Sequence, residues 1–173
     1  LEAMRPDFDP AYELIEQTLP RLGRLSRATF EFCQYSSRYD RYLEGEIPNA
    51  FNPGLCNAAV MDIGVYCIHS LVRLFGMPKQ IKSCSTKLAN GFEGSGAVLM
   101  QYDNMVAEAI YSKTAVSVTP SVIQGEKGSL LMDYVSRPET LELRLRKGSR
   151  DALTGGSIEA LPFTPAKNNM VYE

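Results

Sequence analysis

The stretch AAVMDIGVYCIHSLVRLFG, residues 58–76, has the pattern of a buried helix. Small or apolar side chains occupy most of its faces, and Gly76 with Pro78 just beyond it is a normal signal for a helix end. Four polar residues interrupt this pattern: Asp62, Tyr66, His69 and Arg73. At about 100° per residue they fall within a stripe roughly 60° wide. The sequence therefore predicts a helix that is apolar almost all round and carries one narrow polar stripe.

The polar stripe has two interpretations: the solvent side of a mostly buried helix, or a surface that faces a cleft. It lacks the Lys, Glu and Gln residues that solvated faces usually carry. A carboxylate in a partly buried site is costly unless it has partners, and Asp, Tyr and His are residue types that transfer protons. Asp62, Tyr66 and His69 are therefore candidate substrate-binding residues. His69 taken alone also fits a structural histidine with satisfied hydrogen bonds.

The segment before this helix predicts one more helix and a strand. Asp9 can cap a helix that Pro10 begins and Gly23 follows, and residues 25–35 alternate as a strand does. Residues 36–54 are rich in polar, aromatic and turn-forming residues without a regular period, which predicts a long loop.

The segment after the helix predicts a meander of short strands. The strand-like runs are Ile81–Leu88, Gly96–Tyr102, Met105–Ser112, Ser121–Gln124, Ser129–Asp133 and Thr140–Leu145. Asp103-Asn104 and Glu126-Lys127 are suited to hairpin turns between neighbouring strands. The tail after Lys147 predicts either an edge strand or a loose segment. The fold class expected is α+β, with one open, largely antiparallel sheet packed on one face by two helices.

Composition excludes several classes of partner. The chain has 173 residues and a formal net charge of −2, which gives no electrostatic reason to expect nucleic acid or an anionic membrane. No apolar run approaches the roughly 18 residues of a membrane-spanning helix, and the first residues lack the pattern of a secretory signal. The four cysteines form no CxxC pair, so we expect no metal site and a cytoplasmic protein with reduced thiols.

Four segments in order resemble one enzyme family. They are EAM at 2–4, AAVMDIGVYCIH at 58–69, GSGAVLMQYDNMVAEAIYS at 94–112 and IQGEKGSLLM at 123–132. Together they resemble the C-terminal domain of the glucose-fructose oxidoreductase / inositol dehydrogenase superfamily, and within it the dihydrodiol dehydrogenase and xylose dehydrogenase branch. The resemblance implies that residues 1–8 are the end of a nucleotide-binding domain. Residues 9–173 would then form the substrate-binding and oligomerisation domain.

The resemblance also implies a chemistry for the polar stripe. Tyr66 and Asp62 match the family's catalytic positions, so Tyr66 would exchange a proton with the substrate oxygen, and Asp62 would orient a substrate hydroxyl or hold a lysine. A tyrosine needs a nearby cation for this work at neutral pH, and the family supplies a lysine from its other domain. The substrate would be a sugar, polyol or related hydroxyl or carbonyl compound. The family's pairing of sheets face to face implies a homodimer.

The cofactor of such an enzyme is NAD or NADP, and this chain is not expected to bind it alone. The sequence has no G-x-G-x-x-G fingerprint and no counterpart of the family's Glu-Lys-Pro segment. The chain lacks an initiating Met, which favours a fragment; an alternative is a stand-alone, non-catalytic domain that binds a ligand or protein and dimerises through its sheet. One departure concerns residues 54–58, which read Gly-Leu-Cys-Asn-Ala where many relatives carry a glycine run, and it leaves the shape of the pocket open.

Overall fold

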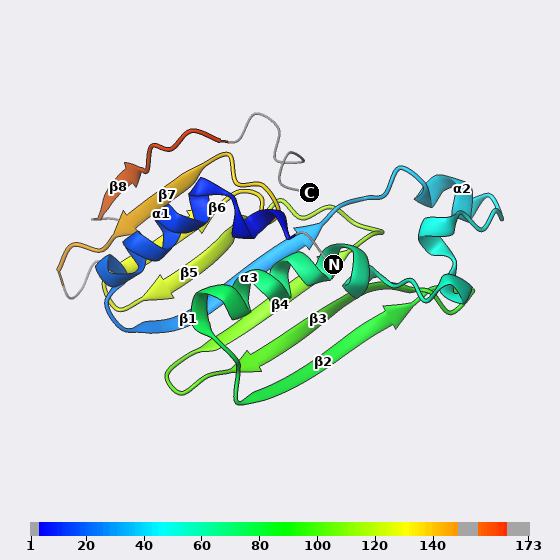
Figure 1. The fold of residues 1–173 in the computed structure, drawn as a ribbon, viewed down its shortest axis with the longest axis horizontal. Coiled ribbons are helices and arrows are strands. Elements are labelled where there is room, and N and C mark those ends of the chain that lie inside the picture. Colours follow the sequence, from blue (N-terminus) through cyan, green and yellow to red (C-terminus); the bar gives the residue numbers. More distant parts are fainter. Residues whose placement is uncertain (1–3, 149–155, 166–173) are drawn as a thin grey trace.

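The chain folds around a single mixed sheet. A computed structural model describes residues 4–148 and 156–165 (Figure 1). The described strands are β1 (Leu25–Cys33), β2 (Gln80–Lys87), β3 (Glu93–Gln101), β4 (Val106–Ser112), β5 (Ser121–Gly125), β6 (Gly128–Met132), β7 (Leu141–Leu145) and β8 (Ser157–Ala160). They lie in the order β2-β3-β4-β1-β5-β6-β7-β8. β1 pairs in parallel with β4, and the other described pairs are antiparallel, which confirms the predicted open, largely antiparallel sheet.

The two predicted hairpin turns are present. The amide of Tyr102 donates a hydrogen bond of 2.9 Å to the carbonyl of Met105, which closes the turn between β3 and β4. Gly125 pairs with Gly128 across the turn between β5 and β6. The tail contributes β8, an edge strand beside β7, so the first of the two alternatives for this segment holds for residues 157–160.

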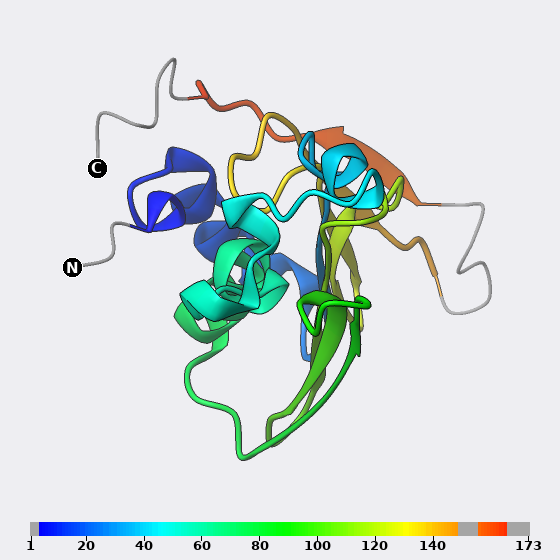
Figure 2. The same ribbon diagram turned by 90° about the vertical axis from the view of Figure 1, so that its right-hand side faces the viewer.

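Two helices cover one face of the sheet, as predicted. Figure 2 shows α1 (Pro10–Thr18) and α3 (Val65–Phe75) on the same side of the strands. α1 begins where the sequence predicts, because Asp9 Oδ1 accepts a hydrogen bond of 3.0 Å from the amide of Ala11. Asp9 is only 1% exposed, and burial raises the pKa of its carboxyl. Its other oxygen, Oδ2, has no hydrogen-bond partner among the described residues.

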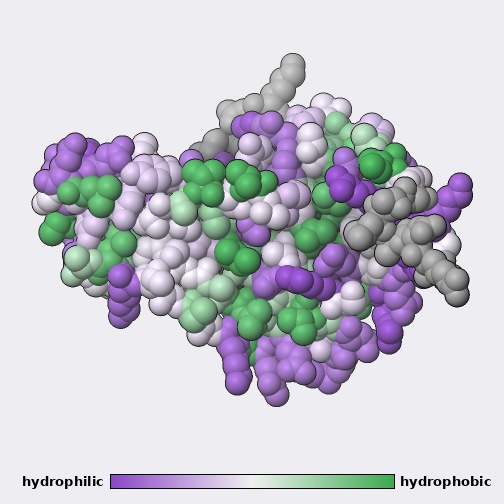
Figure 3. Space-filling model, turned by 180° about the vertical axis from the view of Figure 1, so that it is seen from behind, coloured by the Kyte–Doolittle hydropathy of each residue, from purple (hydrophilic) through white to green (hydrophobic). Residues whose placement is uncertain are grey.

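The register of the strands decides which side chains meet the helices. One row across six strands is buried throughout: Met100, Ala107, Ala28, Ile123, Leu130 and Leu143. The row beside it faces away from the helices: Leu99, Glu108, Thr29, Val122, Leu131 and Glu142. We call the face that carries this second row the outer face. Figure 3 shows apolar and polar side chains intermixed on it.

The apolar side chains of the outer face differ from those that alternation suggests. The expectation is that this face carries a share of Val98, Met100, Tyr102, Met105, Ala107, Ala109 and Tyr111. Apart from Tyr102, which is half-buried, all of these are buried in the structure. Leu99 and Val106, 48% and 49% exposed, are instead among the apolar residues of the outer face. The sequence alone leaves open which parity points outward, and the register of β3 and β4 places Leu99, Gln101, Val106 and Glu108 on the outer face.

The long loop has more local structure than its sequence predicts. It contains the short helix α2 (Tyr39–Leu43), which projects from one end of the sheet in Figure 1, and two single turns at Asn49–Phe51 and Pro53–Leu55. Aromatic contacts organise it: the ring of Phe51 packs on Phe92 with centroids 5.0 Å apart. Within the described part of the chain, the helices are all too short or too polar to cross a membrane.

Candidate active site

The helix that carries the polar stripe begins with a π-helical turn. This turn spans Val60–Gly64 and continues directly into α3. Glu93 Oε1 accepts a hydrogen bond of 3.1 Å from the amide of Val60, which fixes the start of the turn. A π-turn holds more residues per turn than an α-helix, and such turns are frequent at functional sites. Asp62 therefore projects from the π-turn, whereas Tyr66 projects from the first turn of α3.

Gly64 explains why this turn can lie against the sheet. A Cβ atom at Gly64 would stand 2.8 Å from Cδ1 of Tyr111 and 2.9 Å from its Cγ, both closer than real contacts allow. Tyr111 lies in β4 and is 2% exposed, so its ring has little room to move. The missing side chain at position 64 thus brings the backbone between Asp62 and Tyr66 close to β4.

The C-terminal half of the polar stripe, His69 and Arg73, contacts the N-terminal segment of the chain. His69 Nε2 lies 2.8 Å from Asp7 Oδ1. Arg73 donates to the carbonyl oxygen of Pro6, and its Nε is 3.2 Å from Glu16 Oε1. These contacts place His69 and Arg73 against residues 6–16 and outside the set of residues that lines the cavity beside Asp62 and Tyr66.

Asp62 and Tyr66 line a shared cavity of about 260 Å³. The cavity lies where the parallel strands β1 and β4 both end, and it also contacts Phe32, Gln34 and Lys113. The Asp62 side chain is 49% exposed, so its carboxylate reaches solvent. The structure therefore brings together two of the three candidate substrate-binding residues at one opening.

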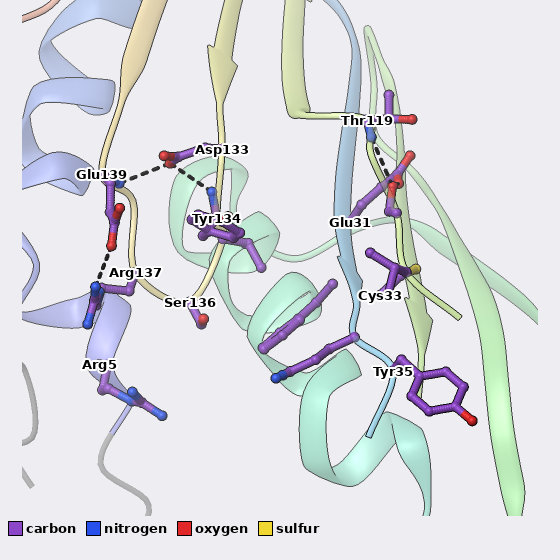
Figure 4. A pocket seen from close by; sticks show the side chains of 15 residues that line it. Arg5, Glu31, Cys33, Tyr35, Thr119, Asp133, Tyr134, Ser136, Arg137 and Glu139 are labelled. Carbon is purple, nitrogen blue, oxygen red and sulfur yellow. Dashed lines mark hydrogen bonds and ion pairs between the residues drawn. The ribbon is translucent and has the colours of Figure 1, made fainter. Parts of the chain in front are cut away.

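A larger cavity of about 660 Å³ adjoins this one and shares Arg5, Phe32 and Gln34 with it. Figure 4 shows its walls, with Arg5 from the N-terminal segment, Cys33 at the end of β1 and Asp133 after β6. Asp133 Oδ1 accepts hydrogen bonds from the amides of Tyr134 and Glu139, at 2.8 and 2.9 Å, and so holds the connection to β7. Burial raises the pKa of the Cys33 thiol, which makes Cys33 a poor nucleophile.

Lys113 is a site residue that sequence reasoning missed. It follows β4 directly and is only 4% exposed. Its Nζ donates to Asp62 Oδ2 at 2.5 Å and to the carbonyl oxygen of Ala50 at 2.9 Å. The available signal is a lone cation directly after the strand-like run 105–112, and nothing in the linear sequence connects it to Asp62.

Arg5 is a second cation that the sequence analysis did not assign to the site. Its Nη2 is 3.4 Å from the hydroxyl of Tyr66, and its guanidinium carbon lies 5.7 Å from the centre of the Tyr66 ring. Phe32 contacts the same ring edge-on, with centroids 5.8 Å apart. Tyr66 therefore has a positive charge from its own chain beside it, whereas the resemblance led us to expect a lysine from another domain.

Residues 54–58, just before the helix, include one residue in the left-handed backbone conformation. Cys56 has φ of 54°, in the left-handed region that normally favours glycine. The side chain of Asn52 accepts a hydrogen bond of 2.9 Å from the amide of Gly54 and supports the preceding turn. The chain therefore enters the helix through a left-handed residue, although this segment is not a glycine run.

The described residues contain no cluster of three or more His, Cys, Asp or Glu side chains that could hold a metal ion. What the site offers is a phenol, a carboxylate and two cations around a water-accessible cavity. This set can bind hydroxyl or carbonyl groups and move a proton to or from an oxygen atom.

Sequence comparison finds related proteins along the whole chain. Residues 11–131 match the family described as the GFO/IDH/MocA C-terminal domain. The chain is 43% identical over 173 residues to scyllo-inositol 2-dehydrogenase (NADP(+)) IolU of Bacillus subtilis, covering 100% of this chain and 50% of that protein. It is 45% identical over 172 residues to the uncharacterized oxidoreductase YgjR of Escherichia coli, covering 99% and 50%. This chain thus spans about half the length of the curated relatives it matches.

More distant sequence relatives and solved structures also match this chain. Trans-1,2-dihydrobenzene-1,2-diol dehydrogenase of Homo sapiens is 26% identical over 133 residues, which cover 74% of this chain and 37% of that protein. Among solved structures, aldose-aldose oxidoreductase from Caulobacter crescentus complexed with glycerol superposes with a TM-score of 0.71 at 15% identity, covering 97% of this chain and 49% of that one. An NAD binding oxidoreductase from Klebsiella pneumoniae gives 0.71 at 17% identity, covering 92% and 45%.

Proposed function

This chain belongs to the GFO/IDH/MocA C-terminal domain family, and from that premise we propose that the protein carrying it is an NAD(P)-dependent oxidoreductase that acts on a polyol, sugar or related hydroxyl or carbonyl compound. This chain would supply the substrate-binding half of the active site. The names of its relatives support a ring that carries hydroxyl groups, since one is an inositol dehydrogenase and another a dihydrodiol dehydrogenase.

One observation carries this proposal: Asp62 and Tyr66 open into the same cavity, each beside a cation of this chain. A solvated helix face would not need a buried lysine against its carboxylate or an arginine against its phenol. The geometry therefore favours the cleft interpretation of this half of the polar stripe. The contacts of His69 with Asp7 support the structural interpretation for the other half.

Each residue has a proposed role in the reaction. The Tyr66 hydroxyl would exchange a proton with the substrate oxygen whose carbon is oxidised or reduced, and Arg5 places a positive charge beside that hydroxyl. Asp62 would accept a hydrogen bond from a neighbouring substrate hydroxyl, because a carboxylate is an acceptor. Together the two contacts would fix a vicinal pair of hydroxyl groups, and orientation of this kind lowers the barrier substantially.

We infer that this chain does not hold the phosphates of a dinucleotide. The sequence has no glycine-rich phosphate-binding loop, and the cavity beside Tyr66 is small. The cofactor would be held by the part of the protein that its relatives have and this chain does not match, and when bound there it would supply the hydride chemistry. The relative from Bacillus subtilis supports NADP, while the structural neighbours leave NAD equally acceptable.

We further propose a division of the chain and a partner. Residues 1–8 would be the crossover from a nucleotide-binding domain, anchored on α3 through Asp7, and residues 9–173 would be the substrate-binding and oligomerisation domain.

The outer face of the sheet would pair with a second copy of this chain, and the exposed Leu99 and Val106 on this face support the pairing. A cytoplasmic location is in keeping with four cysteines that form no disulfide among the described residues.

An assay of the full-length protein tests the proposed function. Purified protein is mixed with NADP⁺ or NAD⁺ and a panel of inositols, aldoses and cyclic vicinal diols, and reduced nicotinamide is followed spectrophotometrically. We expect turnover with at least one ring that carries adjacent hydroxyl groups. Turnover with none of the panel and with neither cofactor would contradict the proposal and would favour a non-catalytic binding domain.

A further inference from the structure

Lys113 has the most unusual environment of the charged side chains near the site. Its ammonium group is enclosed by the end of β4, the π-turn and the long loop. Besides its two hydrogen bonds, Nζ lies 5.0 Å from the centre of the Phe51 ring and 5.4 Å from that of Phe92. The cation is therefore satisfied by a carboxylate, a carbonyl oxygen and two aromatic faces.

The ion pair between Lys113 and Asp62 is strongly asymmetric in burial. The Lys113 side chain is 5% exposed and that of Asp62 is 49% exposed. Burying an ammonium group is costly unless it is paired, so packing alone gives no reason for a lysine at this position. The asymmetry means that the lysine is almost fully enclosed, whereas the carboxylate is open to the cavity.

The two oxygens of Asp62 consequently have different surroundings. Oδ2 accepts the hydrogen bond from Lys113. Oδ1 has no protein hydrogen-bond partner within residues 4–148 and 156–165, and the side chain lines the cavity beside Tyr66. The hydrogen bond from Lys113 to Oδ2 restricts rotation of the carboxylate and leaves Oδ1 available to the cavity.

We propose that Lys113 is a positioning residue: it holds Asp62 through Oδ2 and thereby presents Oδ1 to a hydroxyl group of the substrate. This inference rests on the proposed function, in which Asp62 contacts the substrate. It also links the site to the long loop, because the same ammonium group binds the carbonyl oxygen of Ala50 and faces Phe51. Because the Lys113 side chain is only 5% exposed, its role in this proposal is exerted through Asp62.

A double-mutant cycle in the full-length protein tests this inference. Lys113→Met keeps the length of the side chain and removes its charge and donors. We expect kcat/KM to fall about 10- to 100-fold, mainly through a higher KM, because a misplaced contact group costs about this much. In an Asp62→Asn background the same change should lower kcat/KM by no more than about twofold, since the group that Lys113 positions is already altered. Equal losses in both backgrounds would overturn the inference.

A matched control removes another lysine that pairs with an aspartate. Lys79 pairs with Asp103 on the surface, where both side chains are about two-thirds exposed. Lys79→Met should leave kcat/KM unchanged, and a loss equal to that of Lys113→Met would overturn the inference. If Lys113→Met does not fold, Lys113→Gln replaces it in the cycle. Lys113→Arg, which retains a charged donor, should then raise KM less than Lys113→Gln does; a KM that neither variant changes would overturn the inference.

A structural measurement separates this inference from the proposed function. In a crystal structure of the Lys113→Met protein, which needs no turnover, the Asp62 carboxylate should leave the position it has beside residue 113. An unchanged carboxylate would overturn the positioning role whatever the enzyme does. Conversely, a Tyr66→Phe protein with normal turnover would overturn the proposed role of Tyr66 and leave the coupling between Lys113 and Asp62 intact.

Discussion

Gly64→Ala tests the account of how the fold places the site. The new Cβ would stand 2.8 Å from Cδ1, 2.9 Å from Cγ and 3.2 Å from Cε1 of the buried Tyr111 ring. These three atoms belong to the body of a ring and not to the end of a flexible chain. Tyr111 is also confined from the other side, because its hydroxyl would lie 2.4 Å from a Cβ at Gly96. Neither the ring nor the π-turn can yield without disturbing the other.

The sign of the effect on stability is diagnostic. In an open helical position, replacing Gly by Ala stabilises a protein by up to about 1 kcal/mol. Overpacking a tight core costs about 1–3 kcal/mol. We therefore expect Gly64→Ala to lower the free energy of unfolding by about 1–2 kcal/mol. Because Gly64 lies between Asp62 and Tyr66, kcat/KM should fall as well, although neither side chain is changed.

Chemical denaturation of the full-length protein, beside the wild type, measures the first effect. Gly54→Ala is the matched control, because a Cβ there meets only the Asn52 side-chain oxygen, at 3.1 Å. We expect the control to stay within about 0.5 kcal/mol of the wild type. A Gly64→Ala protein that is as stable as the wild type, or more stable, would refute the close packing of the π-turn on Tyr111.

Three further predictions follow from burial, sequence and register. Burial raises the pKa of Asp9 above its ordinary value of 3.8, so the wild type loses stability as pH rises from that value through the folded-state pKa. Asp9→Asn should therefore have a higher free energy of unfolding than the wild type at pH 7, and this difference should close toward pH 4; a difference that does not change with pH would contradict the prediction. Calorimetry should detect no NADH or NADPH binding to the isolated chain, and micromolar affinity would show that it holds a cofactor site of its own. Sedimentation at micromolar concentration should give a dimer that Leu99→Lys converts to a monomer, whereas a wild-type species of monomer mass would reject the outer face as an interface.

The sequence predicted the local parts of this fold well, because their signals are local. The Asp9 cap, the Gly76 helix end and the two-residue hairpin turns each depend on residues that are neighbours in the chain. The orientation of the central strands was not accessible in the same way. It depends on the parallel pairing of β1 with β4, in which residues such as Ala28 and Ala107 are far apart in the sequence.

The candidate site was predictable to the extent that it lies on one helix. Helical spacing alone groups Asp62 with Tyr66, and the same spacing also groups His69 with them. The cations were not predictable, because Lys113 and Arg5 meet the helix only through the tertiary fold. The division of the polar stripe has the same origin: the N-terminal segment covers His69 and leaves Asp62 open.

In the proposed NAD(P)-dependent oxidoreductase Tyr66 transfers a proton, and the kcat of a Tyr66→Phe protein measures its part in that step. The substitution removes one oxygen atom and keeps the ring that packs on Phe32. In the full-length enzyme, with a substrate from the panel, we expect kcat to fall by about 10²- to 10⁴-fold while the free energy of unfolding stays unchanged. A kcat close to that of the wild type would contradict the account and make Tyr66 a packing residue.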